Sequence, residues 1–228
     1  MKRSAVNRYI AEAAAFFAEN KFILPPYAHW PPKAWASLGA KSEGFRSQRL
    51  GWDVTDFGSG DFFRKGLTLF TLRNGSPPGI NPGKCYAEKI MLVRANQVTP
   101  FHYHARKTED IINRGGSGAG SLAVHLYHRN EADGFADRRV QAICDGVSRE
   151  VEAGGMVVLG PGESITLPPY LYHSFYAVGG FALIGEVSSF NDDESDNYFY
   201  KKTVRYVGIE EDEPPLRLLC TEYPELSL

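Results

Sequence analysis

Three histidines and one glutamate have the residue types and the spacing of a metal site. His102 and His104 form a His-x-His pair, and Glu109 follows after four residues. Side chains two apart on a β-strand point to the same face, so imidazoles rooted about 7 Å apart can converge on one ion. Glu109 can add an oxygen after a short bend. His173, which follows a rigid Pro-Pro turn and precedes an apolar run, is the candidate for the third imidazole.

This donor set is suited to a divalent transition metal. Three imidazoles and one carboxylate suit Mn, Fe, Co, Ni or Zn, and affinity order alone does not choose among them. On an octahedral ion such a set leaves open positions, which suit a bidentate ligand such as a hydroxy-carbonyl group. A lone His-x-His pair is common by chance, so the prediction depends on the joint spacing of all four residues.

The elements that must position these ligands are short β-strands. Runs rich in strand-forming residues and bounded by turn residues lie at 66–74, 86–93, 99–104, 109–114, 121–128, 155–159, 164–167, 173–178 and 181–188. Many short strands without helices between them indicate an antiparallel sandwich or jelly roll. We therefore expect an all-β, jelly-roll barrel. The charged segment 130–139 is expected to be a loop, and the turn after the first run spans residues 74–79.

The N-terminal region has a different character. Apolar residues at helical spacing predict an amphipathic helix with Ser4 as its N-cap and an end near Asn20. Two Pro-Pro pairs then forbid regular structure, and residues 33–38 are expected to form a second helical piece. We expect residues 1–60 to be a helical and irregular arm packed on a barrel of residues 61–228, within a single structural domain.

Composition excludes several classes of function. The 228 residues carry a net charge of −2, which favours neither nucleic acid nor an anionic membrane as a partner. Acidic residues interrupt the N-terminal apolar run, which argues against a signal peptide, and no stretch is apolar enough to span a membrane. Three scattered cysteines do not form a disulfide framework, so a reducing cytoplasm is the expected setting.

Both parts of the ligand set resemble the two motifs of the cupin superfamily. The positions that match are His102, His104, Glu109 and Gly116 in the first motif, and Gly162, Pro168 and His173 in the second. The sequence departs from the motifs at Asn96 and Tyr170, where Gly is frequent, and at Ala177, where Asn is frequent. These are scaffold positions, so the departures weaken the expected turn geometry more than the ligand set.

Longer runs resemble one family of cupin sugar isomerases, the D-lyxose isomerases. The similar segments are HYHARKTEDIINRGG from His102, YAEKIM from Tyr86, GEVSSFNDD from Gly185 and IEEDEPPLRLLCTEYP from Ile209. The resemblance implies a cytoplasmic, homodimeric, Mn-preferring isomerase. It further implies interconversion of D-lyxose and D-xylulose, and also of D-mannose and D-fructose.

Such a reaction needs a group that moves a proton between C1 and C2 of the sugar. Lys107 lies inside the ligand segment, where a nearby dication would depress its pKa, so it could act as acid or base. Glu186 is the stronger candidate for the base, because it lies in an apolar strand, where a carboxylate is costly unless it is paired, hydrogen-bonded or near a metal. The alternatives are a solvent-facing lysine at 107, and for Glu186 a structural ion pair with Lys89 or Arg114.

Sugar hydroxyls need polar partners and one aromatic face. Lys89, Asp193 and Arg205 are the candidates for hydroxyl binding, together with Asp196, and Trp52 or Phe101 for stacking. Because Asp193 lies in a run of charges, a solvated loop is its alternative.

Three other functions remain open. An Fe-dependent cupin dioxygenase could use the same four ligands. A phosphosugar isomerase should show a phosphate-binding cluster of Arg, Lys, Ser or Thr, and the sequence has no clear one. A non-enzymatic sugar-binding cupin would keep the pocket but would not need Lys107 or Glu186.

Overall fold

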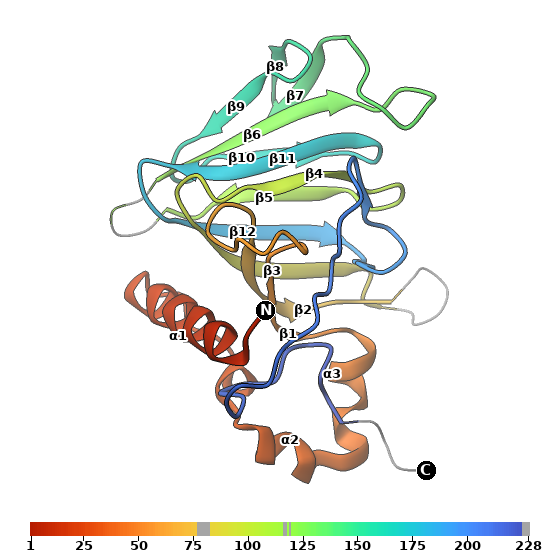
Figure 1. Cartoon of the computed structure of the whole chain (residues 1–228). Helices are drawn as coiled ribbons and strands as arrows, with labels where there is room; N and C mark the ends of the chain where they lie inside the picture. Colours follow the sequence, from red (N-terminus) through yellow and green to blue (C-terminus); the bar gives the residue numbers. More distant parts are fainter. Residues whose placement is uncertain (77–82, 116–117, 119, 225–228) are drawn as a thin grey trace.

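A computed structural model describes residues 1–76, 83–115, 118 and 120–224. Two antiparallel sheets face each other and enclose the main apolar core (Figure 1). The larger sheet has the strand order β1-β2-β3-β12-β5-β10-β7-β8, and the smaller has the order β13-β4-β11-β6-β9. The expectation of an all-β, cupin-type jelly-roll barrel with an N-terminal helical arm is confirmed.

The larger sheet carries the two candidate glutamates, Glu109 on β5 and Glu186 on β12. Its strands are β1 Gly51–Thr55, β2 Leu67–Arg73, β3 Tyr86–Val93, β5 Glu109–Asn113, β7 Val140–Cys144, β8 Val147–Val151, β10 Ser164–Leu167 and β12 Ala182–Ser189. β12 pairs with β3 on one side and with β5 on the other. Glu186 is therefore placed opposite Lys89 on β3 and opposite Ile111 on β5.

The smaller sheet carries the imidazoles. Its strands are β4 Thr99–Tyr103, β6 Ser121–His128, β9 Met156–Leu159, β11 Leu171–Val178 and β13 Tyr198–Phe199. Leu122, Val124 and Leu126 of β6 point into the core, as the alternation of the sequence predicts. β11 pairs with β4 so that His173 lies opposite His102.

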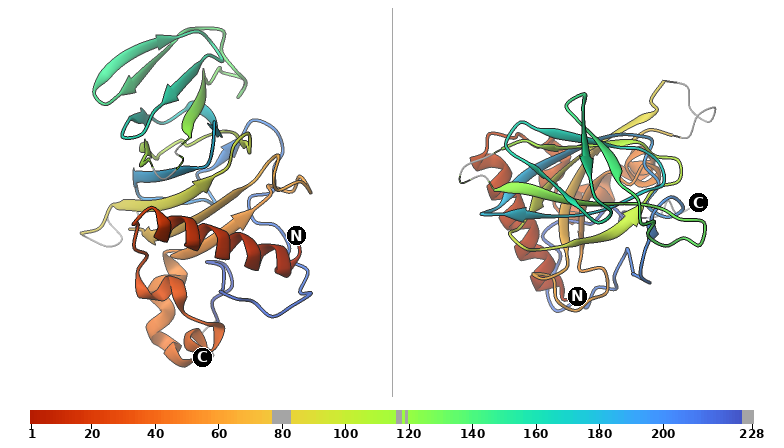
Figure 2. Two further views of the ribbon diagram at one scale, coloured as in Figure 1. Left: turned by 90° about the vertical axis from the view of Figure 1, so that its left-hand side faces the viewer. Right: turned by 90° about the horizontal axis from the view of Figure 1, so that it is seen from above.

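The N-terminal arm covers the outer face of the larger sheet. It comprises α1 Arg3–Glu19, α2 Pro32–Leu38 and α3 Glu43–Ser47, with the 3₁₀ turns η1 Pro26–His29 and η2 Gly39–Ser42. α1 packs across β1, β2 and β3 (Figure 2), and its apolar face forms a second core with residues such as Phe70 and Ile90. Within the described residues, no helix is long and apolar enough to span a membrane.

Two details of the arm differ from the expectation. The helix begins at Arg3 with Lys2 as its N-cap, and Ser4 instead binds the carboxylate of Asp212 through its N–H (2.9 Å) and its hydroxyl (2.7 Å). β1 lies inside the range 1–60 but pairs with β2 along its whole length, so the arm ends before Gly51 rather than at residue 60. The expected turn at residues 74–79 lies partly outside the described residues.

The sequence reasoning missed one hairpin. β7 and β8 are joined by Asp145 and Gly146, both with positive φ, which is the turn that a two-residue hairpin loop requires. Buried Val140, Ala142 and Cys144 alternate with exposed residues on β7. The alternation on β7 and the Asp-Gly turn after it could therefore have predicted this hairpin from the sequence.

Candidate metal centre and catalytic cavity

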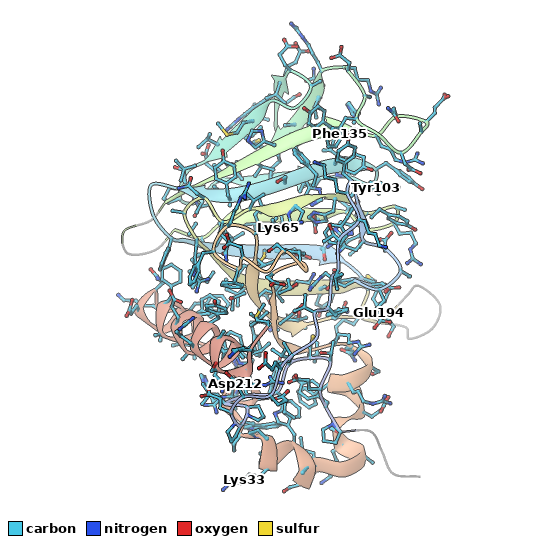
Figure 3. The ribbon with its side chains drawn as sticks, viewed as in Figure 1. Lys33, Lys65, Tyr103, Phe135, Glu194 and Asp212 are labelled. Atoms are coloured by element: carbon cyan, nitrogen blue, oxygen red, sulfur yellow. The ribbon has the colours of Figure 1, made fainter. Side chains whose placement is uncertain are left out.

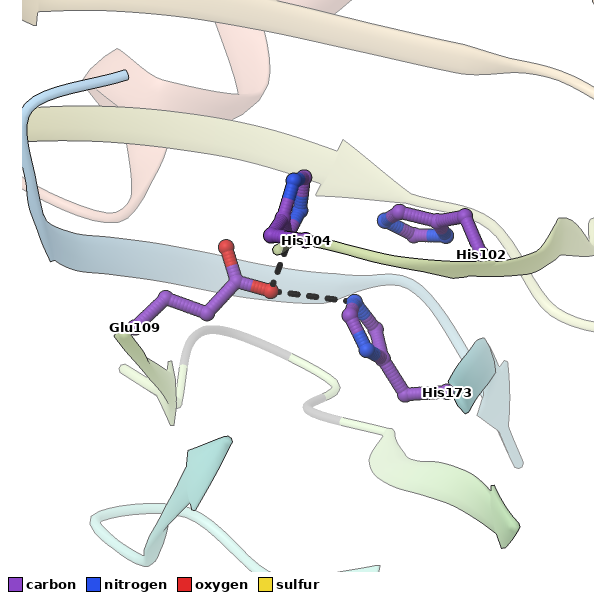
Figure 4. Close-up of side chains that lie close together, drawn as sticks. All are labelled: His102, His104, Glu109 and His173. Carbon is purple, nitrogen blue, oxygen red and sulfur yellow. Dashed lines mark ion pairs between the residues drawn. The ribbon is translucent and has the colours of Figure 1, made fainter. Parts of the chain in front are cut away.

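The structure brings His102, His104, Glu109 and His173 together inside the barrel (Figure 4). One possible ligand atom from each lies within 4.8 Å of the others, and all four residues are buried. Glu109 Oε1 is 3.0 Å from His173 Nε2 and 3.8 Å from His104 Nε2. These side chains come from β4 and the turn after it, from the first residue of β5 and from β11, so the barrel itself assembles the group.

Backbone carbonyl groups orient all three imidazoles. Nδ1 of His102 is 2.8 Å from Pro100 O, Nδ1 of His173 is 3.0 Å from Leu171 O, and Nδ1 of His104 contacts Asp196 O. Because a carbonyl only accepts, each Nδ1 carries a hydrogen, and Nε2 of each ring is left to face the ligand group. This is the arrangement that holds metal-binding histidines in proteins.

The protonation states fit a cation-binding role. Burial lowers the pKa of His102 well below its usual value and lowers the pKa of His104 to about 3. Both rings are thus neutral near pH 7, and His104 Nε2 is buried without a hydrogen-bond partner among the described residues. Lone pairs on neutral imidazoles beside one carboxylate are a donor set that a divalent metal ion fits.

Two of the three departures from the cupin motifs fall at sharp turns. Asn96 has φ +60° and Tyr170 has φ +63°, a left-handed conformation that glycine adopts most easily. Both turns nevertheless form: Tyr170 N–H donates to His104 O (2.8 Å), and Asn96 N–H donates to Ala177 O (3.0 Å). Tyr170 therefore ties the ligand segment to the turn that precedes His173. Gly116 lies outside the described residues.

Lys107 and Glu186 lie against the ligand group. Lys107 is 3% exposed, and its Nζ is 2.5 Å from Glu109 Oε2 and 3.0 Å from Glu186 Oε1. The alternative of a solvent-facing lysine is therefore wrong. Burial acts to lower the pKa of Lys107, but Glu109, Glu186 and Asp193 outweigh it and raise the pKa above its usual value. The expected depression concerns a bound dication and stays a prediction, but the sequence could not reveal that three acids surround the ammonium group.

Glu186 also has the ion pair considered as its alternative. Lys89 Nζ is 3.3 Å from Glu186 Oε1, so Lys89 rather than Arg114 is the partner. Asn191 Oδ1 accepts hydrogen bonds from both lysines, at 2.8 Å from Lys89 and 3.1 Å from Lys107. Both ammonium groups thus contact the same oxygen of Glu186, Oε1, at the wall of the cavity.

A series of ion pairs extends from Lys89 to Asp53. Asp193 is 3.7 Å from Lys89 Nζ and 3.2 Å from Arg205 Nη2, and Arg205 Nη2 also binds Asp53 at 2.5 Å. Burial raises the pKa of Asp193, but Lys89 and Arg205 outweigh it and hold that pKa well below its ordinary value. Asp193 is therefore a largely buried, paired carboxylate, 13% exposed, and not a residue of a solvated loop. Sequence reasoning missed Asp53 and Asn191.

The carboxylate of Asp196 binds the backbone of the ligand segment. It accepts from the N–H groups of Ala105 (2.8 Å), Arg106 (3.2 Å) and Lys107 (3.1 Å). These residues connect His104 to Glu109. Asp196 was predicted to bind a sugar hydroxyl, but its carboxylate instead accepts these backbone hydrogen bonds and fixes the shape of the loop.

The two aromatic candidates for stacking lie outside the cavity. Trp52 is buried beneath α1, where it stacks on Phe17 and donates from Nε1 to Ala28 O (2.9 Å). Phe101 packs against Phe135, which Figure 3 labels in the upper part of the molecule. Phe57, Phe175 and Phe199 line the cavity instead, together with Asn197. Trp52 therefore belongs to the second core, and Phe101 lines a separate pocket with Phe135 and Tyr200.

Comparison with known proteins identifies a family along nearly the whole chain. A family model described as D-lyxose isomerase matches residues 1–223. A D-lyxose/D-mannose isomerase of Serratia proteamaculans is 52% identical over 227 residues, and one of Escherichia coli O157:H7 is 50% identical over 226 residues. Both alignments cover 98% of this chain and 98% of the relative.

A solved structure has the same fold. The L-ribose isomerase of Acinetobacter sp. DL28, in complex with L-ribose, superposes with a TM-score of 0.62 at 14% sequence identity. The superposition covers 92% of this chain and 98% of that one. From the match along nearly its whole length and the identity to curated relatives, the chain belongs to the D-lyxose isomerase family.

Proposed function

We propose that this protein is a metal-dependent aldose–ketose isomerase that interconverts D-lyxose and D-xylulose, and also D-mannose and D-fructose. The observation that carries the proposal is that the group of three imidazoles and Glu109 lies beside Lys107 and Glu186 at one cavity. A site for an ion and a carboxylate able to move a proton are the two components that this reaction needs. The names of the curated relatives support the choice of sugars.

Each group has a separate role in the proposed reaction. A divalent ion held by His102, His104, Glu109 and His173 would act as a Lewis acid at the O1 and O2 end of the sugar. Glu186 takes the proton from one of the two carbons and returns it to the other. The ammonium group of Lys107 donates to the sugar oxygen that gains negative charge, and Lys89 keeps Glu186 in place through its own contact with Oε1.

We propose Mn²⁺ as the preferred ion, with Co²⁺, Ni²⁺, Fe²⁺ or Zn²⁺ as substitutes. A mixed set of imidazole and carboxylate donors is compatible with each of them. The preference for manganese comes from the family resemblance, and metal analysis of the purified protein with activity under each ion tests it.

The enzyme is further proposed to be a cytoplasmic homodimer. Cys85, Cys144 and Cys220 are free thiols, which suits a reducing compartment. Val158 and Val178 are each 43% exposed on the outer face of the smaller sheet, and apolar side chains gathered on one face are typical of an interface. Sedimentation of the wild type against Val158→Asp tests the dimer. A wild type that sediments as a monomer contradicts it.

An aldose panel tests the reaction itself. Ketose formation is measured for pentoses and hexoses before EDTA treatment, after it, and after addition of Mn²⁺, Co²⁺ or Ni²⁺. The expected result is conversion of D-lyxose under anaerobic conditions, which separates an isomerase from an O₂-dependent dioxygenase. If no sugar is converted under any of these metals, the isomerase proposal fails, and sugar binding without turnover would indicate a binding cupin.

A further inference from the structure

We propose that Asn197 is a specificity-determining residue that binds a sugar hydroxyl beyond the two reacting carbons. This inference rests on the proposed isomerase function and deepens it. Asn197 lines the same cavity as His102, His104, Lys107 and Glu186. It follows directly after the segment that shapes the ligand loop, and no sequence motif pointed to it.

The first argument is an unused acceptor. Asn197 Oδ1 is buried, and within the described part of the chain it has no hydrogen-bond partner. Buried polar atoms nearly always have partners, because leaving one unpaired costs about tenfold or more in an equilibrium constant. An unpaired acceptor at the wall of a cavity is therefore suited to a ligand that donates, and each hydroxyl of a sugar is such a donor.

The second argument is a complementary donor. Arg205 lines the same cavity, and its Nη1 is also buried without a partner among the described residues, while Nη2 binds Asp53 and Asp193. A hydroxyl both donates and accepts. Asn197 and Arg205 thus offer one acceptor and one donor to the hydroxyls of a sugar in this cavity.

The third argument is that Asn197 is held rigidly. On one side, Asp196 is fixed by its hydrogen bonds to the ligand loop. On the other, Tyr198 and Phe199 form β13, which pairs with β4 so that Phe199 lies opposite His102. A side chain fixed between two anchors can discriminate between hydroxyl positions, because the site does not rearrange to follow a misplaced group.

The position of the ligand group indicates which hydroxyls are concerned. If O1 and O2 face the ion, the hydroxyls left for Asn197 are those on C3, C4 and C5. D-lyxose and L-ribose differ only in the configuration at C4, so this pair of sugars tests that hydroxyl directly. Analogues of D-lyxose that lack the hydroxyl at C3, C4 or C5 test each position in turn.

The experiment compares wild type, Asn197→Leu and Asn197→Asp, all loaded with the metal that supports the highest activity. Leucine has nearly the size of asparagine and removes the acceptor, whereas aspartate keeps one. Tyr198→Phe is the control, because it alters the same segment only at an exposed hydroxyl that donates to Ser195 O. Melting temperature and metal content are measured for every variant, and kcat and KM for every sugar.

We expect Asn197→Leu to lower kcat/KM for D-lyxose about tenfold or more. On the analogue that lacks the bound hydroxyl, Asn197→Leu and wild type should have equal kcat/KM, because the interaction is already missing. Asn197→Asp should retain more of the preference for D-lyxose over L-ribose than Asn197→Leu does. If Asn197→Leu does not fold, Asn197→Asp is the variant that is compared with wild type.

Two results would overturn the inference: no loss with D-lyxose, or the same loss on D-lyxose and on all the deoxy analogues. A wild type that converts no aldose is a different failure, because it refutes the proposed function and not the role of Asn197 alone.

Discussion

Asp196 binds the backbone of Lys107 although the two residues are 89 positions apart in the sequence. The carboxylate of Asp196 accepts from Lys107 N–H, and the carbonyl group of Asp196 accepts from Nδ1 of His104. One residue thus orients a metal-ligand candidate and fixes the loop that carries the candidate acid. The segment after β12 is therefore part of the reaction site and not only its rim.

We expect Asp196→Asn to weaken metal binding roughly 10- to 100-fold, the usual effect of losing a group that orients a ligand. The amide keeps one oxygen but points N–H donors at backbone N–H groups, so the loop between His104 and Glu109 loses its fixed shape. Competition with a chelating dye measures the affinity without depending on turnover.

Asp192→Asn is the matched control for that variant. Asp192 lies in the same segment and pairs with the Arg106 side chain, but it is partly exposed, and its carboxylate accepts from Glu194 and Ser195 N–H rather than from the backbone of the ligand loop. Its metal affinity should stay within about twofold of wild type. Equal weakening in both variants would mean that general loosening of the segment, and not Asp196, sets the affinity.

Glu186→Gln should lower kcat roughly 100- to 10,000-fold while the metal remains bound, because the amide cannot take the proton. The measurement pairs initial rates with metal content of the same samples. Glu150→Gln, at an exposed position on β8, controls for the loss of one carboxylate. Turnover close to wild type in Glu186→Gln would show that another group is the base.

The period of a β-strand explains both a success and an error of sequence reasoning. The alternation that placed His102 and His104 on one face also requires that Phe101, which adjoins His102, point to the other face. Phe101 accordingly lies outside the cavity. The alternation rule, applied to Phe101 as well, would have excluded it as a stacking residue. On β1, Trp52 faces α1 whereas its neighbour Asp53 binds Arg205 in the interior.

Other parts of the site could not be predicted from the sequence. The contact between Asp196 and the ligand loop, and the place of Asn197 between Asp196 and β13, depend on how distant segments meet. The direction of the pKa shift of Lys107 depends on Glu109, Glu186 and Asp193 being gathered around one atom. The metal-ligand candidates, in contrast, could be recognised from the sequence, because their spacing is defined within two short segments.

Removing the metal should abolish turnover without unfolding the protein. His102 and His104 are neutral, and Lys107 lies 2.5 Å from Glu109, so the ligand group is not left with an unbalanced charge. We expect EDTA to lower the melting temperature, because an ion that binds only the folded state stabilises it, and to leave the circular dichroism spectrum unchanged.

Addition of Mn²⁺ should then restore both activity and melting temperature, and the same treatment of His173→Ala should restore neither. Full activity in protein shown by elemental analysis to be free of metal would contradict the role proposed for the ligand group.

Asp193 should make the stability of the fold depend on pH in the acid range. Its pKa is held below the ordinary value in the folded state by Lys89 and Arg205, against the effect of burial. A carboxyl of this kind stabilises the folded state above its unfolded pKa of about 3.9, and this contribution is lost as the pH falls toward the folded pKa. Asp193→Asn should thus lower the free energy of unfolding at pH 7 by about 3 kcal/mol, the cost of breaking a buried pair.

The difference between wild type and Asp193→Asn should stay constant from pH 7 to pH 5 and shrink below about pH 4, by up to about 1.4 kcal/mol per pH unit. Urea unfolding at a series of pH values measures it. Asp137→Asn, at an exposed position in the charged loop, should show no such change with pH. A constant difference down to pH 3 would mean that Asp193 is not held ionised by its two cations, and that its contribution comes from packing alone.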